Sequence, residues 1–596
     1  MTDLLLDMKR THHCCELTAD DIDREVVLMG WVQHRRDHGG VIFVDLRDRE
    51  GITQVVFNPG NSEEVHEKAQ QIRSEYVLGV RGKVIGRPDD MINPKMKTGT
   101  VEVMVDELRI FSTAKTPAFQ IEERIEASES IRLQYRYLDL RRPKLKKNIQ
   151  ARHQATMAIR NYLDANGFID IETPFLTRST PEGARDYLVP SRVNQGEFYA
   201  LPQSPQLFKQ LLMISGFDRY YQIVRCFRDE DLRADRQPEF TQIDMELSFV
   251  NEDQVMDVAE GMIRAIFKQV LGMDLGDVFP RMTYEEAVSR FGLDRPDLRF
   301  GMELCDISDI VKDTGFKVFA SVVKNGGLVK AINAKGCATF SRKQIDELTD
   351  YAAVYRAKGL AWIKIREDAS WQSPIAKFFT EDEKDALRRA LDMEPGDIIF
   401  FVADQPGITN EALGQLRNEL GRRLELIDED SYQFTWITHF PLVEYDETEK
   451  RYQALHHPFT APHEDDIDRL DTDPAAIKSR AYDLVLNGIE IGGGSIRIHS
   501  TDLQEKVLSI LGIEAEEANE KFGFLLDALS SGTPPHGGIA FGLDRLIMLL
   551  CKEDSIRNVI AFPKTQKATC LLTKAPSAAA SAQLQELAVK VVKLEE

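Results

Sequence analysis

The chain has 596 residues, of which 43% are hydrophobic and 29% charged, and its formal net charge is −22. This length predicts several domains, since a domain usually has ~100–200 residues. No run of about eighteen apolar residues occurs, so we expect no membrane span. The net charge argues against a general nucleic-acid coat but leaves room for local basic surface. Seven scattered cysteines, an odd number, indicate reduced thiols and a cytoplasmic location.

Residues 1–111 read as a small barrel followed by a linker at 112–149. Strand patterns cover residues 26–32, 41–46, 53–57, 76–84 and 101–108, with a helical pattern at 62–74. Five strands with a helix after the third match an OB-type barrel, which suits single-stranded nucleic acid. A sugar-binding or purely structural barrel is the alternative. The basic run at 141–147 predicts either contact with RNA phosphates or a solvated hinge.

Residues 150–278 begin with a helix and a strand. Ala155, Ile159 and Leu163 recur at helical spacing, and Gly167 stands where the helix would stop. The alternation at residues 169–172 predicts a strand that ends at Pro174. Alone, this pattern is typical of an ordinary helix packed on an edge strand.

A hairpin that could hold a nucleotide follows at residues 227–247. Arg228 and Glu230 are two residues apart, which predicts one face of a strand, and Phe240 opens a second strand pattern. The arginine could pair with a phosphate as a planar fork. The glutamate could accept from an adenine amino group, and the phenylalanine offers a face for stacking.

The pattern changes at residues 279–433. Strands are predicted at 316–323, 362–366 and 398–402, and helices at 341–357 and 410–424. Residues 434–596 return to the earlier pattern. There Gly538 to Gly542 and Arg545 precede an apolar helix at 546–550. A last amphipathic helix is predicted to contain Leu584, Leu587, Val591 and Leu594.

The helix–strand–proline unit, the hairpin and the glycine-rich segment resemble motifs 1, 2 and 3 of the class II aminoacyl-tRNA synthetases, in that order. Residues 180–186, 203–210 and 227–240 resemble those of the bacterial aspartyl-tRNA synthetases (class II, subclass b), and this resemblance covers essentially the whole chain. It implies a multidomain α/β and β fold: an OB-fold anticodon-binding barrel, a class II antiparallel-sheet catalytic domain and an inserted α+β (GAD-type) domain. The implied segments are 1–111, a hinge at 112–149, 150–278, the insertion at 279–433, and 434–596 with a C-terminal extension.

Two cations indicate which amino acid the pocket takes. Lys209 lies three residues after Gln206, and Arg497 lies beyond a predicted glycine turn that follows Glu490. Together they would form an anion pocket, where an arginine fork fits a carboxylate. Lysine would be repelled there, and asparagine would leave a buried cation poorly paired. The pocket therefore favours aspartate.

The resemblance also implies a role for each candidate residue, with ATP as a substrate and Mg²⁺ as the metal. Arg228, Arg497 and Arg545 are the implied catalytic residues. The implied aspartate contacts are Glu182, Ser204, Gln206, Lys209, Arg228, Asp244, His456 and Arg497; the histidine segment also contains His457 and could instead be packed core. The implied ATP contacts are Arg228, Asp229, Glu230, Gln237, Phe240, Glu490, Gly542, Leu543, Asp544 and Arg545. Asp483 and Glu490 are the implied Mg²⁺ ligands, since carboxylates suit a hard cation that bridges phosphates.

The implied tRNA contacts lie in the barrel: Arg36, His38, Phe43, Gln54 and Glu102. Phe43 is expected to stack on an anticodon base, with a core position as the alternative. His38, in an expected loop at residues 35–40, could accept or donate at the third anticodon base, which differs between tRNA(Asp) and tRNA(Asn). A loop histidine with no such role is the alternative.

The implied function is ligation of L-aspartate to tRNA(Asp), and also to tRNA(Asn), by a homodimer. The second product implies a functional link to an amidotransferase. A strictly tRNA(Asp)-specific enzyme is the first alternative. An ammonia-dependent asparagine ligase, which would not need the barrel, and a catalytically dead tRNA-binding paralogue are more distant alternatives.

Overall fold

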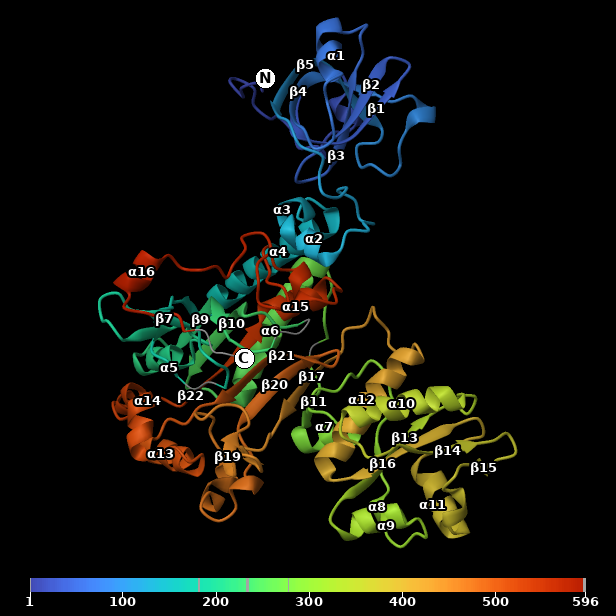
Figure 1. Cartoon of the computed structure of the whole chain (residues 1–596), viewed down its shortest axis with the longest axis vertical. Coiled ribbons are helices and arrows are strands. Elements are labelled where there is room, and N and C mark those ends of the chain that lie inside the picture. Colours follow the sequence, from blue (N-terminus) through green and yellow to red (C-terminus); the bar gives the residue numbers. More distant parts are fainter. Residues whose placement is uncertain (1, 181–182, 232–234, 277, 593–596) are drawn as a thin grey trace. The chain divides into compact units, whose positions relative to one another are not determined.

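The computed structural model describes residues 2–180, 183–231, 235–276 and 278–592, which form two compact units (Figure 1). One unit comprises Met1–Lys147 with Cys570–Ala575, and the other Asn148–Thr569 with Pro576–Glu596. Across the described residues, no helix combines the length and apolarity needed to cross a membrane.

The first unit is built on a closed five-stranded barrel with strand order β1-β2-β3-β5-β4. Its strands are β1 (Glu25–His38), β2 (Val41–Arg47), β3 (Ile52–Phe57), β4 (Val77–Gly86) and β5 (Val101–Ser112), and α1 (Glu63–Ala69) follows the third. Alternating residues such as Val26, Leu28 and Val80 fill the interior, which confirms the predicted barrel. The expected loop at 35–40 is wrong, because β1 continues to His38 and only Gly39 and Gly40, both with positive φ, make the turn.

The basic run after the barrel is tied into the first unit. Arg141 reaches Glu75 at 2.6 Å and lies over the Trp31 ring. Arg142 pairs with Asp139 at 3.1 Å. These two arginines are therefore internal contacts of the hinge. Lys144 and Lys147 of the same run are exposed, so contact of these lysines with RNA phosphates stays a prediction. The short helices here are α2 (Glu129–Gln134) and α3 (Arg136–Asp139), followed by the long α4 (Pro143–Ala165).

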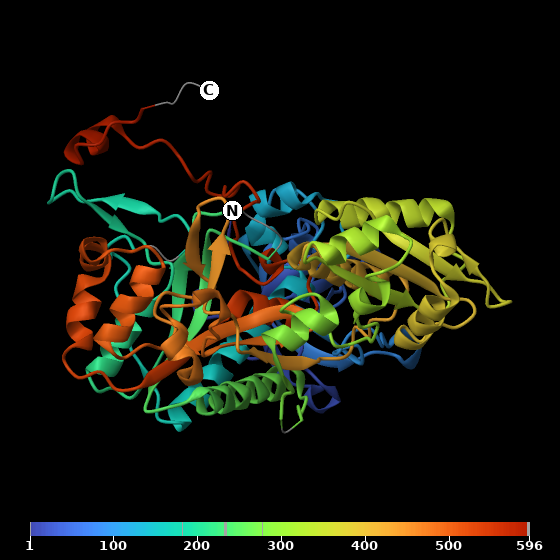
Figure 2. The same cartoon turned by 90° about the horizontal axis from the view of Figure 1, so that it is seen from below.

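The second unit contains an eight-stranded, mainly antiparallel sheet, ordered β11-β17-β20-β21-β22-β10-β9-β6. Helix α6 (Glu252–Leu271) runs along one face of this sheet (Figure 2). Its Met256, Ile263 and Phe267 are buried in the core against the sheet. The strands are β6 (Ile169–Asp170), β9 (Arg219–Phe227), β10 (Glu239–Ser248), β11 (Arg281–Thr283), β17 (Phe434–Thr438), β20 (Ala481–Leu486), β21 (Ile489–Ile496) and β22 (His536–Gly542). The surrounding helices are α5 (Gln206–Ile214), α6 (Glu252–Leu271), α13 (Thr501–Ile510), α14 (Ala515–Leu529) and α15 (Leu543–Leu550). Two small ribbons, β7 (Leu188–Pro190) with β8 (Phe198–Ala200) and β18 (Val443–Asp446) with β19 (Arg451–Ala454), complete this part.

Two local predictions in this sheet are wrong. Arg228 and Glu230 do not share a strand face, because β9 ends at Phe227 and both residues lie in the connection to β10. The glycines before Arg497 do not form a turn: they lie inside β21. A side chain at Gly494 would place its Cβ 2.1 Å from the carbonyl oxygen of Gly538, so close strand packing requires glycine there.

The insertion has its own five-stranded sheet, β12-β13-β16-β14-β15, covered by helices on both faces (Figure 1). Its strands are β12 (Cys305–Asp306), β13 (Leu328–Ala334), β14 (Ala361–Ile365), β15 (Trp371–Gln372) and β16 (Ile398–Asp404). Its helices are α8 (Ser308–Val311), α9 (Lys317–Lys324), α10 (Arg342–Val354), α11 (Glu381–Ala390) and α12 (Pro406–Arg423), preceded by α7 (Tyr284–Phe291). Along β16, Phe400 faces the α10–α12 core and Phe401 the opposite one. The predicted strand at 316–323 is wrong, because this segment is α9.

The C-terminal segment differs from its prediction. Only α16 (Ser581–Glu586) forms, and Val591 is exposed. Leu594 lies outside the described residues. The expected amphipathic helix is therefore wrong over 587–592.

Candidate active site

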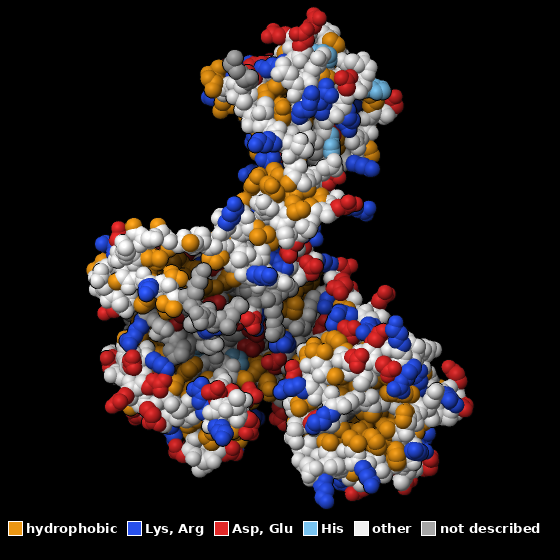
Figure 3. Space-filling view, in the orientation of Figure 1, with side chains coloured by type: hydrophobic (Ala, Val, Ile, Leu, Met, Phe, Trp, Pro, Cys, Tyr) orange, Lys and Arg blue, Asp and Glu red, His pale blue; other side chains and the backbone are white. Residues whose placement is uncertain are grey.

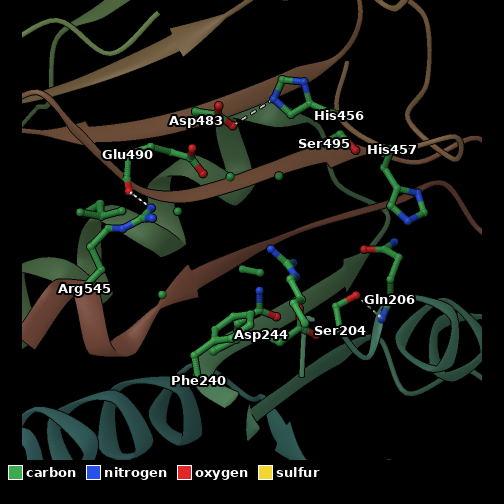
Figure 4. Close-up of a pocket in the computed structure, with 18 of the residues that line it drawn as sticks. Ser204, Gln206, Phe240, Asp244, His456, His457, Asp483, Glu490, Ser495 and Arg545 are labelled. Carbon is green, nitrogen blue, oxygen red and sulfur yellow. Dashed lines mark hydrogen bonds and ion pairs between the residues drawn. The ribbon is translucent and has the colours of Figure 1, made fainter. Parts of the chain in front are cut away.

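A cavity of about 530 Å³ opens on the eight-stranded sheet, between β10, β21 and the start of α15. Figure 4 shows Phe240 and Asp244 on one side of it and Asp483 and Glu490 on the other. It brings together most of the predicted site residues: Ser204, Gln206, Lys209, Arg228, Glu230, Gln237, Phe240, Asp244, His456, Asp483, Glu490, Arg497, Gly542, Asp544 and Arg545.

Lys209 and Arg497 come together as predicted, but they are not free cations. Lys209 Nζ lies 2.7 Å from Asp244 and 3.2 Å from Glu246. Arg497 donates through Nε and a terminal nitrogen to the two oxygens of Glu246 at 3.0 and 3.2 Å. All four side chains are buried, so each charge needs its partners. The expected open anion pocket is thus a pre-paired cluster.

The carboxylates of this cluster differ in their pKa values. Burial would raise the pKa of Glu246, but Arg497 and Lys209 outweigh it and lower the value to about 2. Burial raises the pKa of Asp244, and Lys209 opposes this only in part. Glu246 is therefore the firmly ionised anchor of the arginine fork.

Three buried polar atoms in or beside the cluster have no hydrogen-bond partner within the described chain: Gln206 Nε2, Asp244 Oδ2 and His457 Nε2. Buried polar groups are almost always hydrogen-bonded, so these atoms indicate a polar ligand. Asp244 Oδ2 can accept from an ammonium group. This end of the cavity therefore offers both an acceptor and donors to an amino acid.

His457, rather than His456, faces the charge cluster. Burial, then Arg497 and Lys209, lower the pKa of His457 to about 3, so its ring is neutral near pH 7. The Phe459 N–H donates to His457 Nδ1, which leaves the proton on Nε2. His456, predicted at the aspartate, instead lies 3.2 Å from Asp483.

The other end of the cavity carries an aromatic and arginine slot. The Arg228 guanidinium lies over the Phe240 ring, 5.1 Å from its centroid. Arg545 donates to the Glu490 carbonyl at 2.7 Å (Figure 4) and pairs with Asp235 at 3.1 Å. Glu230 pairs with Arg236 at 2.7 Å. A flat base with an attached phosphate fits these groups.

Two carboxylates stand next to each other over Gly493. A Cβ there would lie 2.6 Å from Asp483 Oδ1 and 3.5 Å from Glu490 Oε1. The Asp483 charge, with burial, raises the pKa of Glu490 to about 7. The described residues contain no cluster of three or more metal-binding side chains. Two carboxylates nevertheless fit Mg²⁺, which usually binds one or two carboxylates together with phosphates and water.

Some predicted residues lie elsewhere. Asp229 is outside the cavity and forms an isolated antiparallel β-bridge with the backbone of Arg185. Leu543 is buried in the core, so its side chain cannot reach a nucleotide. Gln237 lines the cavity, but its side-chain amide is engaged by the backbone of Lys564: Nε2 donates to the carbonyl oxygen, and Oε1 accepts from the N–H. Glu182 lies outside the described residues.

The predicted tRNA contacts on the barrel are partly connected. Arg36 reaches Asp45 at 2.8 Å and Gln54 at 3.1 Å, and Gln54 donates to Glu102 at 2.6 Å. Phe43 pairs across the ladder with Arg36 and is not in the buried core cluster, which disfavours the core alternative. His38 is exposed at the end of β1. On the face seen in Figure 3, basic and acidic side chains are interspersed.

Sequence reasoning missed Glu246 and gave His457 no role of its own. A signal for Glu246 was present: Gln242, Asp244 and Glu246 alternate with apolar residues and so share one face of β10. A row of polar residues on a buried strand face indicates a polar site. No comparable signal separates His457 from His456.

Comparisons with known proteins show which family the chain belongs to. A family model described as "tRNA synthetases class II (D, K and N)" matches residues 128–566, and one for the OB-fold nucleic acid binding domain matches 26–111. The chain is 65% identical to the aspartate–tRNA(Asp/Asn) ligase of Desulfatibacillum aliphaticivorans, over 100% of this chain and 99% of the relative. It is also 65% identical to the ligase of the same name from Desulfosudis oleivorans, over 99% of each chain.

Solved structures share the fold. The asparaginyl-tRNA synthetase of Pyrococcus horikoshii complexed with asparaginyl-adenylate has a TM-score of 0.58 at 19% identity, over 94% of this chain and 98% of that one. The aspartyl-tRNA synthetase of Entamoeba histolytica has a TM-score of 0.57 at 19% identity, over 93% and 91%. Since the first family model covers well over half of the chain, the chain belongs to the class II tRNA synthetases (D, K and N).

Proposed function

We propose that this protein activates L-aspartate with ATP and transfers the aspartyl group to tRNA(Asp) and tRNA(Asn). Relatives of 57–65% identity that span essentially the whole chain carry the name aspartate–tRNA(Asp/Asn) ligase. The observation that carries the amino-acid assignment is the buried pair of cations Arg497 and Lys209, which share the Glu246 carboxylate. Beside them lie donors and an acceptor that have no partner among the described residues. A β-carboxylate complements those cations and donors, whereas a second ammonium group would not.

The proposed reaction needs no covalent protein intermediate. The aspartate α-carboxylate attacks the ATP α-phosphate and pyrophosphate leaves, with Arg228 placed to stabilise the phosphate charge. Arg545 and Phe240 would hold the adenine, and Asp244 the α-ammonium group. Asp483 and Glu490 would hold Mg²⁺, which when bound neutralises phosphate charge. A hydroxyl of the 3′-terminal ribose of tRNA then takes the aspartyl group and releases AMP.

Charging of purified tRNA(Asp) and tRNA(Asn), assayed separately with aspartate, tests this function. Both tRNAs should accept aspartate. Charging of tRNA(Asp) alone would identify the strictly specific enzyme. Aspartate-dependent pyrophosphate exchange without any charging would favour the ammonia-dependent ligase, and no exchange at all would favour the dead paralogue.

His38→Leu is expected to reduce charging of tRNA(Asn) more than that of tRNA(Asp). The exposed ring at the end of β1 can donate or accept, and one such hydrogen bond contributes ~0.5–1.5 kcal/mol, or roughly 2- to 12-fold in kcat/KM. The kcat/KM ratio for the two tRNAs is the measurement. An unchanged ratio would leave His38 without a role in specificity.

Phe43→Ala is expected to lower kcat/KM for tRNA charging and to leave pyrophosphate exchange intact. Stacking on a base contributes ~1–3 kcal/mol, so the loss should be roughly 5- to 150-fold. Gln54 is the proposed neighbour at the base edge, although its amide is already shared between Arg36 and Glu102. Equal loss in both assays would show that the phenylalanine supports the fold instead.

We also propose a homodimer that forms through the segment around Pro174. Ile169, Phe175 and Leu176 are large apolar side chains with 48%, 45% and 53% exposure, which a two-fold interface would cover. Sedimentation at micromolar concentration should give a dimer. Wild-type protein that is monomeric at micromolar concentration would argue against the dimer. If the dimer forms, Leu176→Glu should contain more monomer than wild type at the same concentration.

We propose the segments 1–111, 112–149, 150–278, 279–433 and 434–596 as functional modules, although β11 at 281–283 already belongs to the main sheet, so the insertion's own sheet starts only at Cys305. We propose a cytoplasmic location. Aspartyl-tRNA(Asn) would require an amidotransferase to convert it, which is the proposed functional link.

A further inference from the structure

The Asp544 carboxylate joins the strand that carries Phe240 to the helix that carries Arg545. Its Oδ2 atom accepts from the backbone N–H of Thr241 at 2.8 Å. Thr241 directly follows Phe240 on β10, and Asp544 directly precedes Arg545 on α15. One hydrogen bond therefore connects the immediate neighbours of two residues that line the nucleotide end of the cavity.

Arg152, on α4, supports this connection from outside the cavity. One terminal nitrogen lies 2.5 Å from Asp544 Oδ1, and the other donates to Thr241 Oγ1 at 3.1 Å. The guanidinium thus spans both partners of the connecting hydrogen bond. Asp544 is only 3% exposed, and a buried carboxylate without a counter-ion is costly. Arg152 therefore both neutralises the carboxylate and fixes its direction.

We propose that Arg152 and Asp544 are positioning residues that set the spacing between Phe240 and Arg545 for a purine ring. Each oxygen of Asp544 already accepts from protein, so in this proposal its carboxylate acts through its neighbours rather than as an ATP contact, although it borders the cavity. A ring held between two groups has its best contacts at ~3.5–4 Å on each side, and a gap of 0.5–1 Å forfeits a quarter to a half of that attraction. Small movements of α15 against β10 would thus weaken nucleotide binding. This inference rests on the proposed use of ATP.

Two measurements test the proposal. Calorimetry gives the Kd for ATP alone, and pyrophosphate exchange gives the KM for ATP and the KM for aspartate. Arg152→Met should raise the Kd and the KM for ATP roughly 10- to 100-fold, the scale on which ~1 Å misplacements act. KM for aspartate should stay within about twofold, because the Arg497 cluster is untouched. A merely structural role would instead lower the active fraction and leave both KM values unchanged, and that result would overturn the proposal.

Four further variants sharpen the test. Arg152→Lys keeps the charge without the fork, so its ATP affinity should lie between those of Arg152→Met and wild type. If Arg152→Met does not fold, weaker ATP binding by Arg152→Lys than by wild type tests the positioning role. Asp544→Asn should weaken ATP binding, and the double variant with Arg152→Met should lose less than the product of the two single losses, because the pair acts as one unit. Arg281→Met is the matched control: its partner Asp253 is exposed, and ATP binding should not change.

The outcomes separate this inference from the proposed function. Wild-type protein that binds ATP but shows no aspartate-dependent exchange would refute the amino-acid assignment, while calorimetry would still decide the role of Arg152. Equal ATP affinity in wild type and in folded Arg152→Met or Arg152→Lys would overturn the positioning role. Wild-type protein that binds no ATP would overturn both.

Discussion

Arg497→Ala should abolish aspartate-dependent pyrophosphate exchange and leave the protein folded. The guanidinium is 4% exposed and holds Glu246 through Nε and one terminal nitrogen. In the proposed complex the same guanidinium also contacts the substrate β-carboxylate. Without the guanidinium the substrate β-carboxylate would be desolvated and unpaired, and removal of one partner from a buried ion pair typically costs ~3–5 kcal/mol. That corresponds to a loss of roughly 10²- to 10³-fold or more in kcat/KM for aspartate.

Two comparisons make this result specific. Arg480→Ala removes an arginine that pairs with Glu252 and Glu464 away from the cavity, and exchange should remain near the wild-type level. Arg497→Lys keeps the charge but cannot form the fork, so it should recover little activity. Near-normal exchange by folded Arg497→Ala would refute the assignment of this end of the cavity to the aspartate carboxylate.

The sequence identified the cations of the site but not their electrostatic state. Lys209 and Arg497 are recognisable as an anion site, yet the same strand face that brings Asp244 into the pocket also brings Glu246. Which acid pairs with which cation depends on the register of β10 against β22 and on the path of α5, both of which are tertiary features. Spacing in the sequence alone could not distinguish an open pocket from a paired one.

The insertion contains a second feature that the sequence did not predict correctly. Residues 316–323 contain valines and phenylalanines that favour a strand, yet they form α9. Phe319 is buried against Phe401 of the neighbouring sheet, and Val318 is exposed, which is the one-sided burial of a helix. In such short apolar segments tertiary packing decides between helix and strand. The barrel strands were predictable because their alternation extends over several residues.

Gly538→Ala should both destabilise the protein and raise the KM for aspartate. Gly538 pairs with Glu246 across the sheet, and an added Cβ would lie 2.0 Å from Glu246 Oε2 and 2.1 Å from the Met245 carbonyl oxygen. The Glu246 carboxylate must move, and it carries Arg497 with it. Overpacking of this kind costs ~1–3 kcal/mol of stability. The displaced fork should add at least roughly tenfold to the KM, which corresponds to about 1.4 kcal/mol.

Gly407→Ala is the matched control, because beyond its chain neighbours and the nearby helix backbone no atom of the described residues lies within 4 Å of the Cβ that it would add near the start of α12. Alanine favours a helix over glycine by ~0.5–1 kcal/mol, so this variant should keep or gain stability and keep the wild-type KM. Thermal unfolding and pyrophosphate exchange, measured on both variants, separate the two effects. If Gly538→Ala unfolds earlier but keeps the wild-type KM for aspartate, the carboxylate of Glu246 can move without disturbing Arg497. The fork would then be held by the backbone of β21 and by Ser495, which Arg497 also reaches at 2.6 Å, rather than by the charge cluster.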